Sequence, residues 1–241
     1  MFKIAIIGYG KMGHEVERLL QEHDCTVGVI IDNESDWDIK WNQFIDCDGA
    51  IEFSTPETVI SNISKSISIK MPIVVGTTGW YNRSDGVLND CKSNGSSIIY
   101  GSNFSIGANI FFAITTELAK IMNHHHQYDC SIQETHHVTK KDAPSGTAIT
   151  VAQKMIHELI RKDSWIPDSA PKDNQIPIIS HRLGDAIGEH VVTFSSNEDT
   201  LSVIHHANNR SGLALGAVKA VKWLIENPGI YNFSDIYMQL K

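Results

Sequence analysis

The chain has 241 residues, of which 41% are hydrophobic and 20% are charged. This composition excludes a disordered or fibrous protein, and the length allows one large domain or two smaller ones, each with its own core. The formal net charge is −8 and no run of Lys or Arg exceeds two residues, which argues against a nucleic-acid partner.

The first half of the chain alternates short apolar runs with helical patterns. Apolar runs ending in polar or glycine-rich turns predict strands at 2–7, 26–32, 49–54, 72–79 and 97–102. A helix is predicted after the first glycine-rich turn, and two more at 56–69 and 80–94, the earlier of these with Pro56 in its first turn after a hydroxyl cap. Strands that are apolar on both faces and alternate with helices indicate a parallel sheet covered by helices.

The pattern changes after residue 105. A long amphipathic helix is predicted at 108–123, strands at 128–138, 176–180, 188–196 and 200–206, an irregular surface segment at 161–175, and a last helix at 212–229. The predicted fold class is therefore α/β, with a Rossmann-type parallel-sheet domain over 1–105 and 212–241. The second domain, 106–211, is predicted to be α+β with a mixed, mainly antiparallel sheet.

Targeting and cysteine signals are weak. The apolar N-terminal run is short, with no cleavage pattern and no membrane-length apolar segment, so we expect a cytoplasmic protein without a membrane partner. The four cysteines, at 25, 47, 91 and 130, contain no C-x-x-C pair, which favours reduced thiols over disulfides or a zinc site. We interpret the run at 124–126, His-His-His, as a solvated helix end and predict no metal site.

A glycine motif follows the first predicted strand. Gly8, Gly10 and Gly13 have G-x-G-x-x-G spacing, and Asp32 ends the next apolar run about twenty residues further on. This arrangement is typical of a dinucleotide site, in which a helix N-terminus binds the pyrophosphate and the acid binds the adenosine ribose. A 2′-phosphate would meet the like charge of Asp32, so NADH is the preferred cofactor, while Lys11 leaves NADPH open.

The second site candidate is HHVTKKDAPSGTA, residues 136–148. His136 and His137 end a predicted strand, and a histidine with a near-neutral pKa is suited to proton transfer. Lys140 adds an ammonium, and the helix predicted to start near Gly146 and Thr147 offers N–H groups to an anion. A histidine pair alone is more often structural, but this context favours a site for a small carboxylate or dicarboxylate.

These segments together resemble one enzyme family. GYGKMG, GTTGW, SNFS, HHVTKKDAPSGTA and RLGDAIGEH, in this order, are similar to the motifs of the dihydrodipicolinate reductase family, and the likeness extends over nearly the whole chain. The resemblance implies NAD(P)H-dependent reduction of 4-hydroxy-tetrahydrodipicolinate, through dihydrodipicolinate, to tetrahydrodipicolinate in lysine and diaminopimelate biosynthesis. It also implies a cyclic dicarboxylate substrate and a homotetramer built through the second, substrate-binding and oligomerisation domain.

The resemblance assigns roles to individual residues. It implies that His136 is the proton donor and acceptor, that Lys140 is a second proton donor, and that His137, Gly146 and Thr147 contact the substrate. The implied cofactor contacts are Gly8, Tyr9, Gly10, Lys11, Met12, Gly13, Asp32, Gly76, Thr77, Thr78, Ser102, Asn103, Phe104 and Ser105. Asn33 stands where relatives often carry a basic residue after the ribose acid, which weakens the expectation of NADPH use.

Two alternatives remain at this point. The same dinucleotide domain could serve another small acid, as in the similarly organised aspartate or homoserine dehydrogenases, although the Pro-Ser-Gly-Thr segment argues against this. The chain could instead bind a nucleotide without turnover.

Overall fold

The structure, a computed structural model, describes residues 1–209 and 211–240. The backbone divides into two compact units, Met1–Ile106 together with Ser211–Lys241, and Gly107–Arg210. None of the helices in the described ranges combines the length and apolarity needed to cross a membrane.

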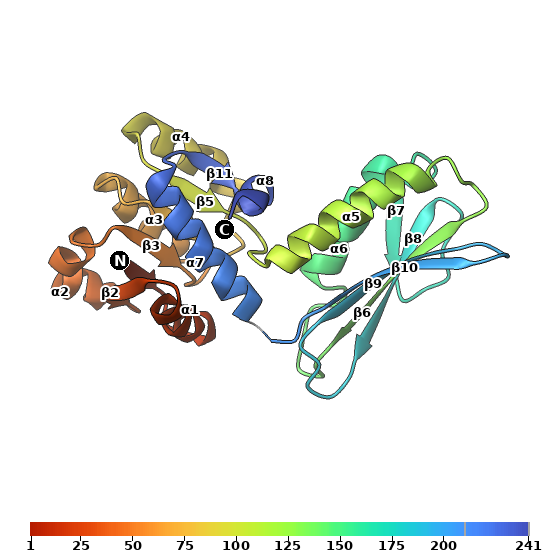
Figure 1. Ribbon diagram of the computed structural model, residues 1–241, viewed down its shortest axis with the longest axis horizontal. Coiled ribbons are helices and arrows are strands. Elements are labelled where there is room, and N and C mark those ends of the chain that lie inside the picture. The colour runs from red at the N-terminus through yellow and green to blue at the C-terminus, as the bar shows by residue number, and fades with distance from the viewer. Residues whose placement is uncertain (210, 241) are drawn as a thin grey trace. The chain divides into compact units, whose positions relative to one another are not determined.

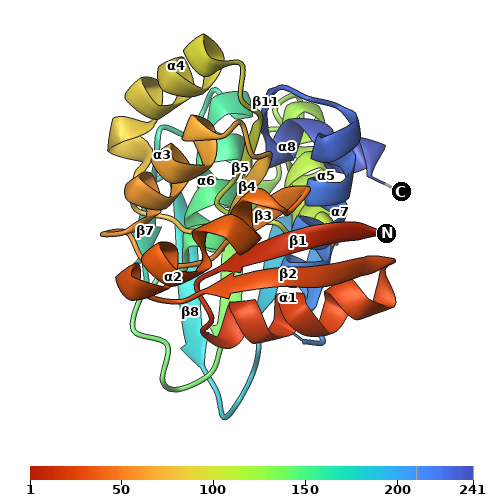
Figure 2. The same cartoon turned by 90° about the vertical axis from the view of Figure 1, so that its left-hand side faces the viewer.

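The first unit is built on a six-stranded sheet with the order β11-β5-β4-β3-β1-β2 (Figures 1 and 2). Every strand pairs in parallel with its neighbours. The strands are β1 (Phe2–Ile7), β2 (Cys25–Ile31), β3 (Gly49–Glu52), β4 (Ile73–Val75), β5 (Ile98–Tyr100) and β11 (Ile230–Asn232). The order reverses at β1, between β2 and β3, and sheets of this type bind ligands at that switch point, beyond the carboxyl ends of the strands.

Helices cover both faces of this sheet, because successive side chains of each buried strand point to opposite sides. Ile4 and Ile6 of β1 join one core, whereas Ala5 and Ile7 join the other. The first core includes α1 (Lys11–Glu22), α7 (Ser211–Glu226) and the short α8 (Phe233–Ile236), followed by a 3-10 turn, Tyr237–Gln239. The second includes α2 (Glu34–Ile45), α3 (Val59–Ser68) and α4 (Ser84–Asn94), which follows a 3-10 turn, Tyr81–Arg83.

The second unit is a five-stranded sheet with the order β10-β9-β6-β8-β7. Its strands are β6 (Asp129–His136), β7 (Ser164–Pro167), β8 (Gln175–Arg182), β9 (Glu189–Ser195) and β10 (Thr200–His206). Two helices, α5 (Ile106–Met122) and α6 (Gly146–Glu158), share one core with the sheet. That core joins Phe111 of α5 and Met155 of α6 to Ile132 and Val192 of the sheet. The sheet therefore has one face covered by helices.

The predicted α/β fold class, with a parallel sheet and a second mixed sheet, is confirmed. In the second sheet β10–β9 and β6–β9 are antiparallel, whereas the shorter pairings β6–β8 and β7–β8 are parallel. The segment 161–175 also contains β7, an edge strand that ends at Pro167 and pairs with β8 on one side. This strand was not predicted because its sequence is polar and contains proline, and an edge strand needs few apolar residues.

Two further differences concern helices of the first unit. Helix α2 was not predicted, although Trp37 and Phe44 are buried in it, because the exposed Ile39 and Ile45 blur its apolar periodicity. Asn33 starts this helix with a capping box shared with Asp36. Pro56 lies in a turn that precedes α3, not in the helix itself, which starts at Val59.

Candidate functional site

The glycine loop of the first unit connects β1 to α1, as its sequence predicts. Gly8 has φ +87°, and a Cβ there would lie 2.4 Å from the carbonyl oxygen of Phe53. A Cβ on Gly13 would lie 2.4 Å from the carbonyl oxygen of Gly8. Both glycines are therefore required by the packing of the protein itself. Gly10 is different, because a Cβ there would meet nothing within 4 Å among the described atoms.

Asp32 is held beside this loop. The backbone N–H of Tyr9 donates to Asp32 Oδ1 at 2.7 Å, which fixes the carboxylate at the carboxyl end of β2. Its neighbours Asn33 and Glu34 add no positive charge. Lys11 is exposed at the first position of α1. A pocket at this end of the sheet is lined by Ile7, Gly8, Ile31, Asp32, Asn33, Glu34, Trp37, Ser54, Thr58 and Asn62.

The remaining residues of the predicted cofactor set lie in the same unit. Tyr9 is half-buried with its hydroxyl on Glu17, and Met12 packs against the core. Gly76 and Thr77 directly follow β4, and Thr78 is exposed beyond them. A Cβ on Gly76 would overlap the ring of Phe53, at 2.0 Å. The glycine loop after β1 and the loop at 76–78 after β4 thus both lie at the carboxyl ends of strands of the first sheet.

The segment 102–105 follows β5. Ser102 is exposed, and the backbone N–H of Ser105 donates to Asn103 Oδ1 at 2.9 Å. Phe104 is buried in the core, with its ring centroid 4.5 Å from that of Phe233. The side chain of Phe104 is therefore a packing element, and any ligand contact at this position is limited to its backbone.

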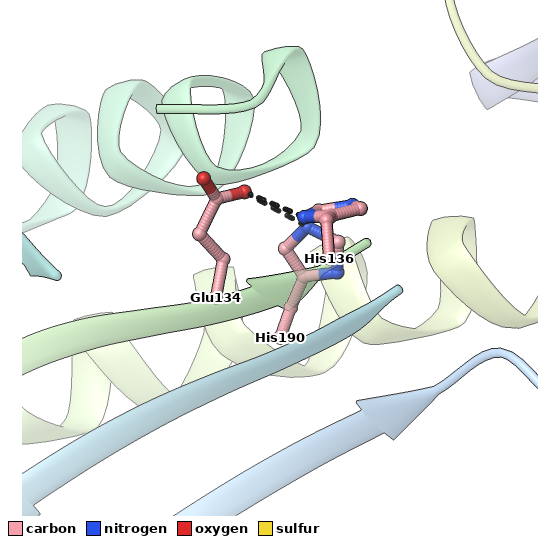
Figure 3. A group of neighbouring side chains, drawn as sticks. All are labelled: Glu134, His136 and His190. Carbon is pink, nitrogen blue, oxygen red and sulfur yellow. Dashed lines mark ion pairs between the residues drawn. The ribbon is translucent and has the colours of Figure 1, made fainter. Parts of the chain in front are cut away.

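In the second unit, His136 is the last residue of β6 and is buried. Glu134 lies two residues earlier on the same face of the strand and is also buried (Figure 3). Its Oε2 atom lies 3.2 Å from His136 Nδ1 and 3.8 Å from Nε2 of His190, which comes from β9. The rings of the two histidines meet edge to face, with centroids 5.2 Å apart. Three polar side chains thus converge inside the second unit.

The other carboxylate oxygen of Glu134 has two donors. Arg182 Nη2, from the end of β8, and the backbone N–H of Ser145 each lie 3.1 Å from Oε1. Burial alone would raise the pKa of Glu134, but the groups around its carboxylate, including the Arg182 and Ser145 donors, outweigh it and hold the pKa below its usual range. Glu134 is therefore ionised at neutral pH.

His190 remains neutral under the same conditions. Burial, with a smaller contribution from the neighbouring His136, lowers the pKa of His190 to about 4. Its Nε2 atom lies 3.1 Å from the hydroxyl of Ser145, which also accepts the backbone N–H of Ala148 and so caps α6. His190 thus connects β9 to the start of α6.

The predicted substrate residues lie beside the cluster of Glu134, His136 and His190 along the chain, after β6 and at the start of α6. His137 follows β6, with its Nδ1 atom 2.7 Å from the hydroxyl of Thr139. Gly146, which is exposed, and Thr147 form the first turn of α6, as predicted. Lys140 is mostly buried, and its Nζ atom lies 2.7 and 2.8 Å from the two carboxylate oxygens of Asp142. The ammonium of Lys140 is thus already in contact with a carboxylate.

No role is predicted from the sequence for Glu134, Arg182, His190 or Gly188. A Cβ on Gly188 would lie 3.2 Å from His136 Nε2, so the ring of His136 packs against this glycine. Arg182, Gly188 and His190 belong to the segment RLGDAIGEH, residues 182–190. Glu134 lies two positions before His136, on the same face of the strand. The spacing of Glu134 was the signal available in the sequence.

The structure also bears on metal binding. The histidines at 124–126 are exposed in the turn after α5, which agrees with a solvated helix end. Glu134, His136 and His190 each offer a ligand atom, and these atoms lie within 4.8 Å of one another. Arg182 already pairs with this carboxylate, and its positive charge disfavours a divalent cation at the same place. The absence of a resident metal stays a prediction.

Comparison with known proteins gives a consistent result. A family model described as dihydrodipicolinate reductase, N-terminus, matches residues 2–104, and one described as dihydrodipicolinate reductase, C-terminus, matches residues 107–237. A 4-hydroxy-tetrahydrodipicolinate reductase of Christiangramia forsetii is 37% identical over 237 residues, which cover 98% of each chain. One of Methanococcoides burtonii is 35% identical over 190 residues, 77% of this chain and 71% of its own.

Solved structures share the fold. Dipicolinate-bound dihydrodipicolinate reductase from Paenisporosarcina sp. TG-14 is similar with a TM-score of 0.80 and 22% identity, covering 98% of this chain and 99% of its own. A probable dehydrogenase from Thermotoga maritima is similar with a TM-score of 0.56 and 11% identity, covering 99% and 93%.

Proposed function

The chain belongs to the dihydrodipicolinate reductase family, and on this premise we propose that it is an NAD(P)H-dependent 4-hydroxy-tetrahydrodipicolinate reductase. It reduces its substrate, through dihydrodipicolinate, to tetrahydrodipicolinate in lysine and diaminopimelate biosynthesis, with loss of water. The observation that carries this proposal is the second unit's cluster, in which a buried His136 lies with Lys140 and the N-terminus of α6 on one segment, 136–148.

The residues of the first unit fit a dinucleotide. Gly10 is not required by packing, so the bare backbone there is best explained by close approach of a pyrophosphate to the start of α1. Asp32 is suited to the ribose hydroxyls, and the loops at 76–78 and 102–105 to the nicotinamide end. When bound, the dinucleotide supplies the hydride for the reduction. We therefore assign the first unit as the cofactor domain and the second as the substrate and oligomerisation domain.

The residues of the second unit supply charge and a proton. The substrate class is a small cyclic dicarboxylate, and dipicolinate bound to the Paenisporosarcina enzyme is consistent with this chemistry. Lys140, His137 and the N–H groups around Gly146 and Thr147 bind and orient the carboxylates. His136 donates the proton that the ring requires beside the carbon that receives hydride. Lys140 is the second candidate proton donor.

A coupled assay tests the function directly. The substrate is generated in place from pyruvate and aspartate semialdehyde by the preceding synthase, and oxidation of NADH and of NADPH is followed by absorbance. We expect rapid oxidation that requires every component. Folded protein that binds NADH but oxidises neither cofactor would leave a dinucleotide-binding protein without this activity.

Gly10→Ala is expected to separate cofactor binding from folding. Because the added Cβ meets no described protein atom, the melting temperature should stay within about 2 °C of the wild type. The Kd for NADH should rise about tenfold or more, since the methyl group prevents close approach of the phosphates. Gly8→Ala is the contrast, because its positive φ and the 2.4 Å contact with Phe53 should destabilise the fold itself. Unchanged NADH affinity in Gly10→Ala would refute the loop assignment.

Asp32→Ala should weaken NADH about 10- to 100-fold and NADPH less, because only the unphosphorylated ribose gains hydrogen bonds from the carboxylate. We propose on the same basis that NADH is preferred. The matched control is Asp32→Asn, which keeps an acceptor for the N–H of Tyr9 and removes only the charge. Isothermal titration of both variants with both cofactors measures the effect, and equal losses for the two cofactors would contradict the ribose contact.

We also propose a cytoplasmic homotetramer. β10 is an edge strand of the second sheet, with exposed Leu201 and Ile204, and α5 exposes Ile110, Ile114 and Ile121. Apolar residues along an open strand and along a helix are typical of a subunit interface. Light scattering of the purified chain tests the state.

A further inference from the structure

We propose that Glu134 is a positioning residue for His136: its carboxylate holds the imidazole as the tautomer with hydrogen on Nδ1, so that Nε2 is the nitrogen that exchanges the catalytic proton. The inference rests on the proposed function, because it names the atom through which His136 acts. It goes further by placing the control of that atom in a residue two positions earlier on the strand.

The first support is the strand itself. Residues i and i+2 of a strand point to the same face, and along β6 the side chains of Cys130, Ile132, Glu134 and His136 are all buried on that face. A carboxyl group at this depth is costly unless it is paired. Its position in the apolar row therefore needs a partner of specific geometry, and His136 is the next residue in the row.

The second support is that Glu134 is kept ionised. Arg182 and the N–H of Ser145 both donate to Oε1, which leaves Oε2 directed at the histidines. An ionised carboxylate accepts hydrogen bonds and donates none. Nδ1 of His136 lies 3.2 Å from Oε2, and neither atom has a hydrogen-bond partner in the described chain, so the contact with this carboxylate favours the hydrogen on Nδ1. The two donors to Oε1 fix the orientation of the carboxylate, which therefore depends on β6, on β8 and on the start of α6.

The third support is the surroundings of the other ring nitrogen. His136 Nε2 lies against Gly188, where even one methyl group would come within 3.2 Å. The loop that carries Gly188 is anchored to the end of β6, because Leu183 N–H donates to the carbonyl of His136 at 2.8 Å. One nitrogen thus faces a fixed carboxylate and the other faces a residue without a side chain. This arrangement suits a histidine whose Nδ1 is held by the carboxylate and whose Nε2 exchanges the proton.

Among the described charged and titratable groups around His136, Glu134 is the carboxylate in contact with the ring. His190 on β9 is neutral, since burial lowers its pKa to about 4, and so does not share the charge of Glu134 as a cation. Arg182 on β8 and Lys140 beyond β6 are positive, with Lys140 paired to Asp142. His205 on β10 stacks beyond His190, with ring centroids 6.3 Å apart, and burial lowers its pKa too. Removing the negative charge of Glu134 therefore leaves His136 among positive neighbours.

The direct test is NMR of the full-length protein labelled with ¹⁵N-histidine. In the wild type we expect the neutral His136 ring to show hydrogen on Nδ1, with the signal assigned by its loss in His136→Gln. Hydrogen on Nε2 instead would overturn the proposal. This measurement needs no variant of Glu134 and no enzymatic activity, so its result stands apart from the success or failure of the proposed function.

The variant Glu134→Gln keeps the side-chain shape and removes the charge. We expect the same spectra to show that the His136 ring loses its preference for hydrogen on Nδ1, because the carboxamide can donate to that nitrogen as well as accept from it. Where the reductase activity is present, kcat should fall about 10- to 100-fold with little change in KM. The matched control is Glu117→Gln, an exposed glutamate of α5 paired with Lys120.

A purely structural role predicts a different result. If Glu134 only neutralises Arg182, Glu134→Gln would lower the melting temperature and leave the tautomer of His136 unchanged, which would refute the proposal. The affinity for NADH is expected to stay the same, because NADH binds the first unit, and it reports that the first unit is intact. A wild type that shows the Nδ1–H tautomer but no turnover would refute the proposed function alone.

Discussion

His136→Gln is expected to lower kcat by about two to four orders of magnitude and to leave KM nearly unchanged. Glutamine has similar reach and can hydrogen-bond to Glu134, but it cannot deliver a proton to the ring of the substrate. A group that acts mainly in the transition state affects kcat more than substrate binding. Steady-state kinetics in the coupled assay measure both parameters.

A histidine outside the site provides the control for this result. His126 is exposed in the turn after α5, and His126→Gln should retain wild-type kinetics. The melting temperature of His136→Gln and its affinity for NADH check that the fold is preserved. A change confined to KM would reduce His136 to a binding role and leave the proton donor to be found among its neighbours, Lys140 first.

Lys140→Ala is expected to lower kcat/KM by about 100-fold or more, through both a higher KM and a lower kcat. In the structure the ammonium lies on both oxygens of Asp142. Its removal takes away a cation for the substrate carboxylate and also leaves the charge of Asp142 unpaired, which repels a dicarboxylate. The double loss explains why both kinetic parameters should change.

The adjacent Lys141 is the matched control. It is exposed, carries the same charge one residue away, and makes no ion pair within 4 Å in the described chain. Lys141→Ala should therefore change kcat/KM by less than about threefold, the usual size of an exposed charge effect. Equal losses in the two variants would show that general attraction of an anion, not contact at Lys140, determines substrate binding.

Local patterns predicted most of the fold. The strand of residues 2–7, the glycine loop and the start of α6 at Gly146 each have a signature in a contiguous stretch of sequence, and the structure shows each of them. The family followed from motifs in a fixed order. Helix α2 was not predicted because two exposed isoleucines disturb its apolar periodicity. Strand β7 was not predicted because its stability comes from pairing with β8.

The hydrogen-bonded group around Glu134 shows where local patterns stop. Arg182 is 48 residues from Glu134, and His190 is 45 residues from Ser145, yet each pair is in direct contact. These contacts depend on the order of strands β8, β6 and β9, which brings distant segments together. No spacing in the sequence encodes that order. His136 could be identified as a candidate from the sequence because it stands in a motif, whereas the residues that contact it come from three strands.

The division of the first unit between two stretches of chain has a consequence for biosynthesis. Helix α7 supplies Ala217, Val218 and Val221 to the core on one face of the first sheet, and β11 completes its edge. A ribosome makes the whole second unit before these residues emerge. The second unit, a continuous segment, is thus able to fold on the nascent chain, while the face of the first sheet that α7 covers is shielded by α1 alone. Segment 1–106 should therefore expose apolar surface on the ribosome for as long as the second unit takes to be made.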